Sequence, residues 1–470
     1  MSGVPAWITP SATSGAVNEN GSTVRFTANT SALPAGTSSA VVNATAIVNG
    51  DTVVKPVTLT VNRDQRKLVP SDVGVALVSV PGWTRLNATI KISDNFGLGA
   101  TWTASSSQPW LTVSQNGDTL TLSAAPSTPL ETISYATVTL SPTTAGVAAP
   151  EVVRVALWRS AYAPATAFRV KTSYWRVAAD PIRPLVYVHN GDSKIDVYNV
   201  YTGQLVLSTA ALGSTLGDMA VSPNGDRLYA VDRGGRSIVV VDLATMTKQA
   251  AWPVTGVTDL ETKLKVIRPN GEELLLTSEQ GAYRVATGRR LATPFRTGII
   301  AASPDGRRVY VQNERDSTTV SIYDVDFSAM GGGTLFAVEG RTAYAGNGSS
   351  GNDIAVSTDG TRVYSASATP SRCTVAKASD FSNLGILPGG EPWPSNVEVD
   401  SLGRVYCGSA APYGNNDVWM HSATGTLLKA FRLSGVGKNL LERQLVVSGD
   451  GMMLIGVTDD PSITFIAVGP

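Results

Sequence analysis

The chain has 470 residues, too many for one ordinary hydrophobic core, so several domains are expected. Its 37 Lys and Arg residues balance 37 Asp and Glu residues, and the zero net charge excludes a whole-protein attraction to nucleic acid or anionic lipid. No apolar run approaches the roughly 18 residues of a membrane span, and two cysteines are too few for a disulfide-dense scaffold.

The composition also bears on where the protein is located. Charged residues make up only 16% of the chain, which suits an all-β protein with a neutral, Ser/Thr-rich surface. The opening MSGVPAWITP lacks the basic and apolar regions of a signal peptide. We expect a secreted, periplasmic or cell-surface protein of bacterial type. The start is interpreted as a mature chain with an added Met, and a leaderless chain is the alternative.

Two passages in the first 160 residues resemble each other. PAWITPSATSG (Pro5–Gly15) parallels QPWLTVSQNGD (Gln108–Asp118), and a stretch of alternating apolar and polar residues follows each. Each passage ends in a strand-like stretch, KPVTLTVN (Lys55–Asn62) and VVRVALW (Val152–Trp158). Period-two alternation with frequent turns predicts antiparallel sandwiches. We therefore expect two immunoglobulin-like β-sandwiches in this part of the chain.

The two modules differ in how they begin. The second, residues 64–160, carries the stretch Arg66–Ser107 ahead of its Pro-Trp pair, whereas the first, residues 1–63, has only four residues before Pro5. The first module is therefore expected to lack its opening strands. Two explanations stay open. The module was cut from a longer precursor, or another chain completes its exposed edge by strand addition, which would give a homo-oligomer or filament.

The rest of the chain repeats one pattern. AVSPNGDRLYAVD (Ala220–Asp232) returns in altered form as AASPDGRRVYVQN (Ala301–Asn313) and AVSTDGTRVYSAS (Ala355–Ser367). The spacing of the copies is roughly 45 residues, which is the period of a propeller blade. The turn glycines that mark the copies are Gly225, Gly271, Gly306, Gly360, Gly403 and Gly451.

Each copy predicts one four-stranded sheet. A strand ends in an Asn-Gly or Asp-Gly turn, an apolar strand returns, and a third strand such as SIVVVD (Ser237–Asp242) follows. Such sheets bury both faces by stacking around an axis, which predicts a seven-bladed β-propeller over residues 161–470. The last copy contains only three predicted strands. TAFRVKTSY (Thr166–Tyr174) is predicted to supply its outer strand and so close the ring.

These motifs resemble known families. The pattern apolar-Ser-Pro-Asp/Asn-Gly followed by apolar-Tyr-Val resembles the YVTN/YncE-like, lactonase-like propellers, whose members include enzymes, surface proteins and binding scaffolds. The Trp-Leu/Ile starts, the turn LPAG (Leu33–Gly36) and the closing V-x-V strands resemble BACON-type modules, which implies carbohydrate association or a spacer role. Trp7, Trp102 and Trp110 are candidate sugar platforms, although their place near strand starts favours core packing.

Residues for catalysis are scarce. His189 and His421 are the only histidines. They are expected on opposite faces, as surface turn residues rather than catalysts. Without an HxxxH or Cys/His cluster, no metal site and no cofactor are expected. Cys373 and Cys407 are expected to be buried small residues, with a disulfide as the alternative. There is no Gly-x-Ser-x-Gly elbow or phosphate loop.

The best candidate site is the propeller face formed by the turns after strands two and four. Its loops combine arginines, aromatic rings and amides, which could hold a polar ligand, and ordinary solvated loops are the alternative. The expected ligand-binding residues are Arg233, Arg236, Arg341, Tyr344, Glu391, Trp393, Tyr413 and Asn416.

The expected function is that of a non-catalytic scaffold. The sandwiches would form a stalk and the propeller a head that binds a protein or glycan on its loop face. One alternative is a lactonase-like hydrolase, which the scarce histidines and the lack of a carboxylate cluster disfavour. The other is a glycan-binding protein that acts through the second sandwich.

Overall fold

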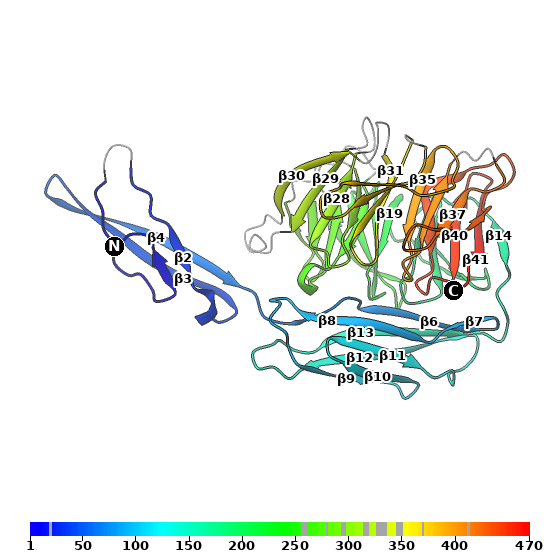
Figure 1. Ribbon diagram of the computed structural model, residues 1–470, viewed down its shortest axis with the longest axis horizontal. Helices are drawn as coiled ribbons and strands as arrows, with labels where there is room; N and C mark the ends of the chain where they lie inside the picture. The colour runs from blue at the N-terminus through cyan, green and yellow to red at the C-terminus, as the bar shows by residue number, and fades with distance from the viewer. Residues whose placement is uncertain are drawn as a thin grey trace.

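The structure is a computed structural model of the chain. It describes residues 1–17, 21–254, 262–278, 281–292, 298–313, 319–325, 336–344, 351–368, 371–410 and 414–470; within 336–344 and at Ala32 only the backbone is described. The fold is all-β and confirms the predicted class, with two β-sandwich modules followed by a seven-bladed propeller (Figure 1). The described 3-10 turns are η1 (Thr30–Ala32) and η2 (Pro269–Gly271).

The first module is a reduced sandwich. Strand β1 (Ile8–Pro10) pairs antiparallel with β2 (Phe26–Ala28), and β3 (Gly36–Val48) pairs antiparallel with β4 (Asp51–Arg63) over their full lengths. Among the described residues, no third strand joins either pair. The β3–β4 hairpin therefore keeps unpaired strand edges along most of its length.

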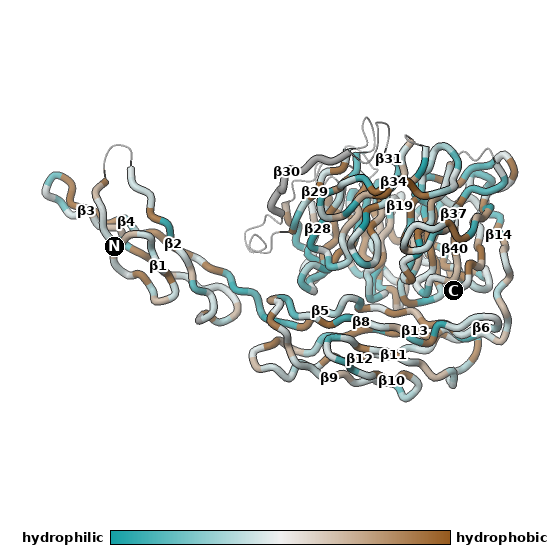
Figure 2. The backbone as a smooth tube through the Cα atoms, viewed as in Figure 1, coloured by the Kyte–Doolittle hydropathy of each residue, from teal (hydrophilic) through white to brown (hydrophobic). Residues whose placement is uncertain are grey.

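This hairpin also exposes apolar side chains. Val42 is buried, but most of its apolar neighbours are not, and Ile47 is 77% exposed. Apolar residues lie near the hairpin tip in Figure 2, as they also do along the strands of the second sandwich and of the propeller. The exposed large apolar side chains of the hairpin are Val41, Ile47, Val48, Val53, Val54 and Val57.

The second module is a complete sandwich of two sheets. One sheet has the order β10-β11-β8-β5 and the other β7-β6-β13-β12-β9, in which β6 runs parallel to β13. Trp102 and Trp110 are buried in the core between the sheets, which confirms core packing for both rings. The strands are β5 (Leu68–Pro70), β6 (Gly74–Val80), β7 (Trp83–Arg85), β8 (Asn87–Asp94), β9 (Trp102–Ser106), β10 (Leu111–Asn116), β11 (Thr119–Ala124), β12 (Thr132–Pro142) and β13 (Glu151–Arg159).

The propeller has seven four-stranded blades within the described ranges. Blades 1 to 3 are β15 (Arg176–Ala179), β16 (Leu185–His189), β17 (Asp196–Asn199), β18 (Leu205–Ser208); β19 (Leu216–Val221), β20 (Arg227–Asp232), β21 (Ser237–Asp242), β22 (Thr247–Pro253); and β23 (Leu264–Ile267), β24 (Leu274–Thr277), β25 (Gly281–Arg284), β26 (Arg289–Leu291). Blades 4 to 6 are β27 (Ile299–Ala302), β28 (Arg308–Gln312), β29 (Thr319–Val325), β30 (Phe336–Tyr344); β31 (Gly351–Val356), β32 (Arg362–Ser367), β33 (Thr374–Lys377), β34 (Asn383–Ile386); and β35 (Pro394–Val399), β36 (Val405–Ser409), β37 (Val418–His421), β38 (Leu427–Phe431).

Blade 7 closes the ring as predicted. It consists of β39 (Leu440–Val447), β40 (Met453–Thr458), β41 (Ser462–Ala467) and, as its outer strand, β14 (Ala167–Lys171) from the start of the propeller. Phe168 of β14 stacks on Phe465 with 4.7 Å between ring centroids. The first strands of successive blades contact one another, and β39 contacts β15, so the ring is continuous.

The repeated Ser and Gly are explained by the turn between strands one and two. Ser222 accepts a hydrogen bond from the Arg227 amide at 2.9 Å and donates one to the Asn224 side chain at 2.8 Å. The same pair of bonds recurs at the corresponding serines of blades 4, 5 and 7. Gly225 has φ +68°, which glycine adopts without steric cost. The repeat is therefore a turn device and not a chemical site.

The repeated tyrosine of strand two is a core residue. These rings are at most 1% exposed, and four of the five hydroxyls have a hydrogen-bond partner, as when Tyr187 donates to Asp180 at 2.6 Å; the buried hydroxyl of Tyr364 has none among the described residues. A buried Tyr adds a large apolar area and satisfies its polar atom locally. The tyrosines at this position are Tyr187, Tyr229, Tyr310, Tyr364 and Tyr406.

The cysteines correct an expectation. They were expected as separate buried residues, but Cys373 and Cys407 form a disulfide. Cys373 precedes β33 in blade 5 and Cys407 lies in β36 of blade 6, so the bond joins neighbouring blades. The pairing was not readable from the sequence because the blades' stacking, rather than the chain spacing, brings the residues together.

The second sandwich is docked on one face of the propeller (Figure 1). Arg85 donates to the Ser401 hydroxyl at 2.7 Å and to the Asp450 carbonyl at 2.8 Å, and Arg154 forms an ion pair with Asp226. All three propeller residues lie in turns between strands one and two. The sandwich therefore covers the face that carries these turns and leaves the opposite face, here called the open face, on the outside.

An apolar seam supports the docking. Val78, Val80 and Trp158 of the sandwich share one core cluster with Tyr201 and Met452 of the propeller. Trp158 and Tyr201 stack with centroids 6.5 Å apart. Burial of several apolar side chains on both partners stabilises the two parts as one unit.

Candidate functional site

The expected site residues fall into two groups on the open face. Arg233 and Arg236 lie in the β20–β21 turn of blade 2, whereas Glu391 and Trp393 lie between β34 and β35, and Asn416 lies in the β36–β37 turn of blade 6. Blades 2 and 6 are not neighbours in the ring. The structure thus places these residues on one face but does not gather them into one pocket.

Three expected residues cannot be placed in this way. Arg341 and Tyr344 lie in β30, where only the backbone is described. Tyr413 lies outside the described residues. Their role in a site stays a prediction.

The blade 2 group is cationic. The guanidinium carbon of Arg233 lies 5.1 Å from the ring centroid of Trp175, and that of Arg176 lies 3.8 Å from the same centroid. The Arg233 Nε is buried and has no hydrogen-bond partner among the described residues. Arg236 is exposed, with φ +47°. Trp175 and Arg176 were not expected in a site.

The blade 6 group presents an aromatic ring. Trp393 is 51% exposed although its φ is +62°, a conformation that is strained for a bulky residue. Its carbonyl accepts a hydrogen bond from the Ala410 amide at 3.1 Å. Its neighbour Pro392 accepts one from the Ser409 hydroxyl at 2.5 Å. The backbone of the loop is thus anchored while the indole extends into solvent.

Both histidines correct an expectation, because they are buried and not surface turn residues. Each is 1% exposed. The His189 Nδ1 accepts from the Gly191 amide at 3.0 Å, so its Nε2 donates to the Gly217 carbonyl at 2.7 Å. Burial lowers the pKa of His189 to about 4 and keeps the ring neutral. His421 Nε2 lies 2.8 Å from the Pro388 carbonyl oxygen. Both rings hold strand ends in place.

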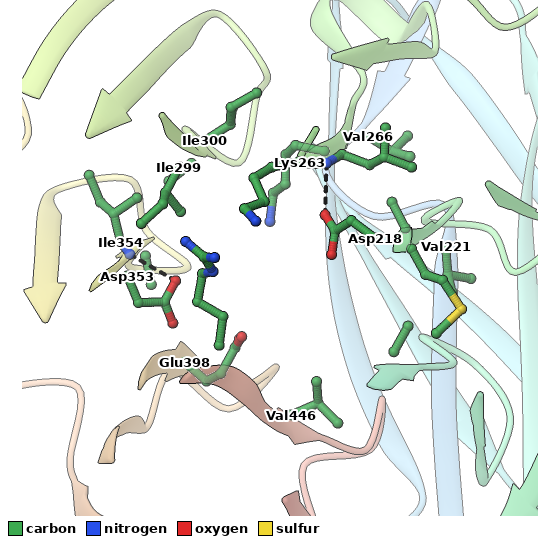
Figure 3. Close-up of a pocket in the computed structure, with 18 of the residues that line it drawn as sticks. Asp218, Val221, Lys263, Val266, Ile299, Ile300, Asp353, Ile354, Glu398 and Val446 are labelled. Atoms are coloured by element: carbon green, nitrogen blue, oxygen red, sulfur yellow. Dashed lines mark hydrogen bonds between the residues drawn. The ribbon is translucent and has the colours of Figure 1, made fainter. Parts of the chain in front are cut away.

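A cavity that the sequence did not suggest lies at the centre of the propeller. Its volume is about 440 Å³, and the first strands of all seven blades line it. We call it the central channel. Figure 3 shows Asp218, Lys263, Ile299, Asp353 and Glu398 arranged around one central space. Cavities of this size are typical of small-molecule sites.

Several polar side chains of the channel connect neighbouring blades. The Asp218 carboxylate accepts from the Leu264 amide of blade 3 at 2.8 Å, and the Asp353 carboxylate accepts from the Val397 amide of blade 6 at 2.9 Å. The Gln444 side chain accepts in the same way from Val177 of blade 1 at 3.0 Å. These bonds satisfy inner-strand amides that no strand pairing reaches.

Two carboxyl groups of the channel have perturbed acidity. Burial raises the pKa of both Asp353 and Glu398, and the charge of Asp353 raises the pKa of Glu398 further. Arg443 opposes the shift at Asp353 and Lys265 opposes it at Glu398. No carboxylate cluster is expected from the sequence. The pair exists because blades 5 and 6 are neighbours in the ring.

A sequence signal for the channel was available in the repeats. The residue four positions before the turn Ser, or before the Asp that replaces it, lies in strand one. In five blades it is polar, which is unexpected for a buried strand. These residues are Arg176, Asp218, Asp353, Asn396 and Gln444.

Among the described residues, no three His, Cys, Asp or Glu side chains are placed to hold a metal ion. No helix in the described part of the chain is long and apolar enough to cross a membrane. No protein-family model matches the chain, and no curated protein matches it.

Proposed function

We propose that this protein is a non-catalytic, secreted or cell-surface scaffold whose propeller head binds a protein or glycan on the open face. We assign the head to the YVTN/YncE-like propellers and the two sandwiches, as a stalk, to the BACON-type modules, on the motifs described above. The observation that carries the proposal is the docking of the second sandwich. Because that module occupies the opposite face, the open face with Arg236 and Trp393 is the one presented to partners.

The disulfide supports the proposed location. Structural disulfides persist in oxidising compartments and are rare in the cytosol. Cys373 and Cys407 are buried and joined between two blades. A secreted, periplasmic or surface protein of this size would retain such a bond.

The hairpin of the first module supports self-assembly as a variant of the scaffold. Exposed apolar side chains and unpaired edges on one hairpin favour association with another strand. We propose a second copy of this chain as the partner. Light scattering and negative-stain images of the full chain test this. Regular oligomers that Ile47→Asp abolishes would support assembly, and a monomer at all concentrations would refute it.

The binding test uses the open face directly. Full-length protein is applied to a glycan array, beside the Arg236→Ala/Trp393→Ala variant. A matched control is Leu384→Ala, since Leu384 is 53% exposed on the outer strand β34. Specific retention that only the double variant loses supports the scaffold. Retention that neither variant changes would move the site elsewhere.

A second candidate, a lactonase-like hydrolase, is favoured by one observation. A buried carboxyl group with a raised pKa is suited to general acid catalysis, and Glu398 lies in the central channel with Asp353. Turnover of a panel of lactones and esters by the full chain tests it. Loss of that turnover in Glu398→Gln, but not in Trp393→Ala, would support the hydrolase. No turnover by the unaltered protein would leave the scaffold.

A further inference from the structure

The central channel is asymmetric in its chemistry. Blade 4 lines it only with apolar residues, among them Ile299 and Ile300, which are at most 7% exposed. Blades 1, 3 and 7 contribute cations instead. Blades 2, 5 and 6 contribute the acidic side chains Asp218, Asp353 and Glu398. A ligand in the channel would therefore meet one apolar wall and, around the rest of the ring, both cations and carboxyl groups. The cationic residues are Arg176, Lys263, Lys265 and Arg443.

The cations continue from the channel to the open face. Arg176 lines the channel and lies against Trp175, and Arg233 lies against the same indole ring near the open face. The Arg233 guanidinium thus extends the line of cations from the channel toward the open face. The sandwich lies across the other face (Figure 1). The open face is thus the entrance.

We propose that the central channel binds a small organic carboxylate, with the carboxylate group among Lys263, Lys265 and Arg443 and the apolar body against the blade 4 wall. The volume of about 440 Å³ suits a ligand of this size. Lys263 extends into the space opposite Asp353 and Glu398 (Figure 3). The lysines and arginine would neutralise the ligand's charge in a site of reduced polarity, where ion pairing is stronger than in water.

The channel acids fit this ligand. Burial raises the pKa values of both acids, so in the protonated form they no longer repel a carboxylate, and Glu398, whose side chain does not accept the amide bonds that Asp353 does, can donate a hydrogen bond to it. Binding should then weaken as the pH rises and these groups ionise. The other charged groups that face them from the inner strands or near their ends are Arg176, Asp218, Lys263, Lys265, Glu442 and Arg443.

The test is calorimetric titration of the full chain with pentanoate, and with pentylamine and inorganic phosphate as comparison probes. Pentanoate should bind saturably, at least ten-fold more tightly than either comparison probe, and at least three-fold more tightly at pH 6 than at pH 8.5. Lys265→Met should weaken pentanoate binding at least ten-fold. Lys248→Met, on the exposed face of the outer strand β22, is the matched control and should not change it.

Several results would overturn the proposal. They are the absence of saturable pentanoate binding, equal binding of pentylamine or phosphate, unchanged affinity at pH 8.5, or equal affinities for Lys265→Met and Lys248→Met. Lys263→Met tests the same point at a buried position, and Lys265 is exposed enough that its replacement should not impair folding. The proposal does not rest on the scaffold function, whose variants lie on open-face loops. Each can therefore fail without the other.

Discussion

Removing the bond between blades 5 and 6 should destabilise the propeller by a predictable amount. The Cys373–Cys407 disulfide closes a loop of 34 residues, and the loss of chain entropy in the unfolded state then corresponds to about 4 kcal/mol at 25 °C. Both residues are buried, at 1% and 4% exposure, in a core cluster with Tyr364 and Val397. Truncation to Ala adds a cavity cost of about 1 kcal/mol. The double Cys373→Ala/Cys407→Ala variant should therefore lose about 5 kcal/mol.

The assay is urea unfolding of the full chain followed by circular dichroism, with thermal scans beside it. For a propeller of roughly 300 residues, this loss lowers the melting temperature by about 8 °C. Each single variant already breaks the bond, so each should lose nearly as much as the double variant. The reasoning is refuted if the two single losses are about half the double loss and add up to it, or if the double variant lies within about 1 kcal/mol of the parent.

Three further predictions concern ring closure, acid stability and the open face. Gly203→Ala should destabilise the closure of blade 7, since a Cβ at this position would lie 2.3 Å from the Phe168 ring. Gly437→Ala is the matched control, because Gly437 has a φ of +69°, close to the +67° of Gly203, but no atom lies within 4 Å of its Cβ position. In urea titrations, Gly203→Ala should cost about 1–3 kcal/mol more than the control, and equal costs would contradict the contact. Folding lowers the pKa of His189 from 6.5 to about 4, so the neutral ring is favoured in the folded state. The contribution of His189 to the free energy of unfolding is therefore complete above pH 6.5, and it falls by up to about 3 kcal/mol as the pH drops to 4. Urea midpoints at pH 7.5, 5.5 and 4 should therefore converge between the parent and His189→Gln as the pH falls, and parallel curves would refute this. Trp393→Gly should leave the urea midpoint unchanged or raise it, because glycine adopts the positive φ without strain and the Trp393 ring is half exposed. The same variant should abolish glycan-array retention. A loss of stability above about 2 kcal/mol would instead make Trp393 a structural residue of the loop.

The blades could be predicted because their signals are local. In the turns of blades 2, 4, 5 and 7 the Ser hydroxyl bonds to groups two and five residues away, as at Ser222, and the turn Gly three residues after it has positive φ. Such short-range chemistry leaves a regular mark on the sequence. The outer strand of blade 7 could be predicted by counting strands. The last copy of the repeat has only three, and Thr166–Tyr174 is a strand-like segment that belongs to no other copy.

The tertiary structure decided which residues far apart in the sequence come into contact. Asp353 and Glu398 belong to different blades and become one carboxyl pair only when the inner strands meet around the axis. The same stacking joins Cys373 to Cys407 and buries His189 against Gly217. The sequence by itself determined the strand repeat, the turns and the all-β class, because these depend on neighbours along the chain. The channel, the disulfide and the covered face depend on the ring being closed and the sandwich docked. The polar residues of strand one recur in the repeats, but no local pattern records which side chains they meet.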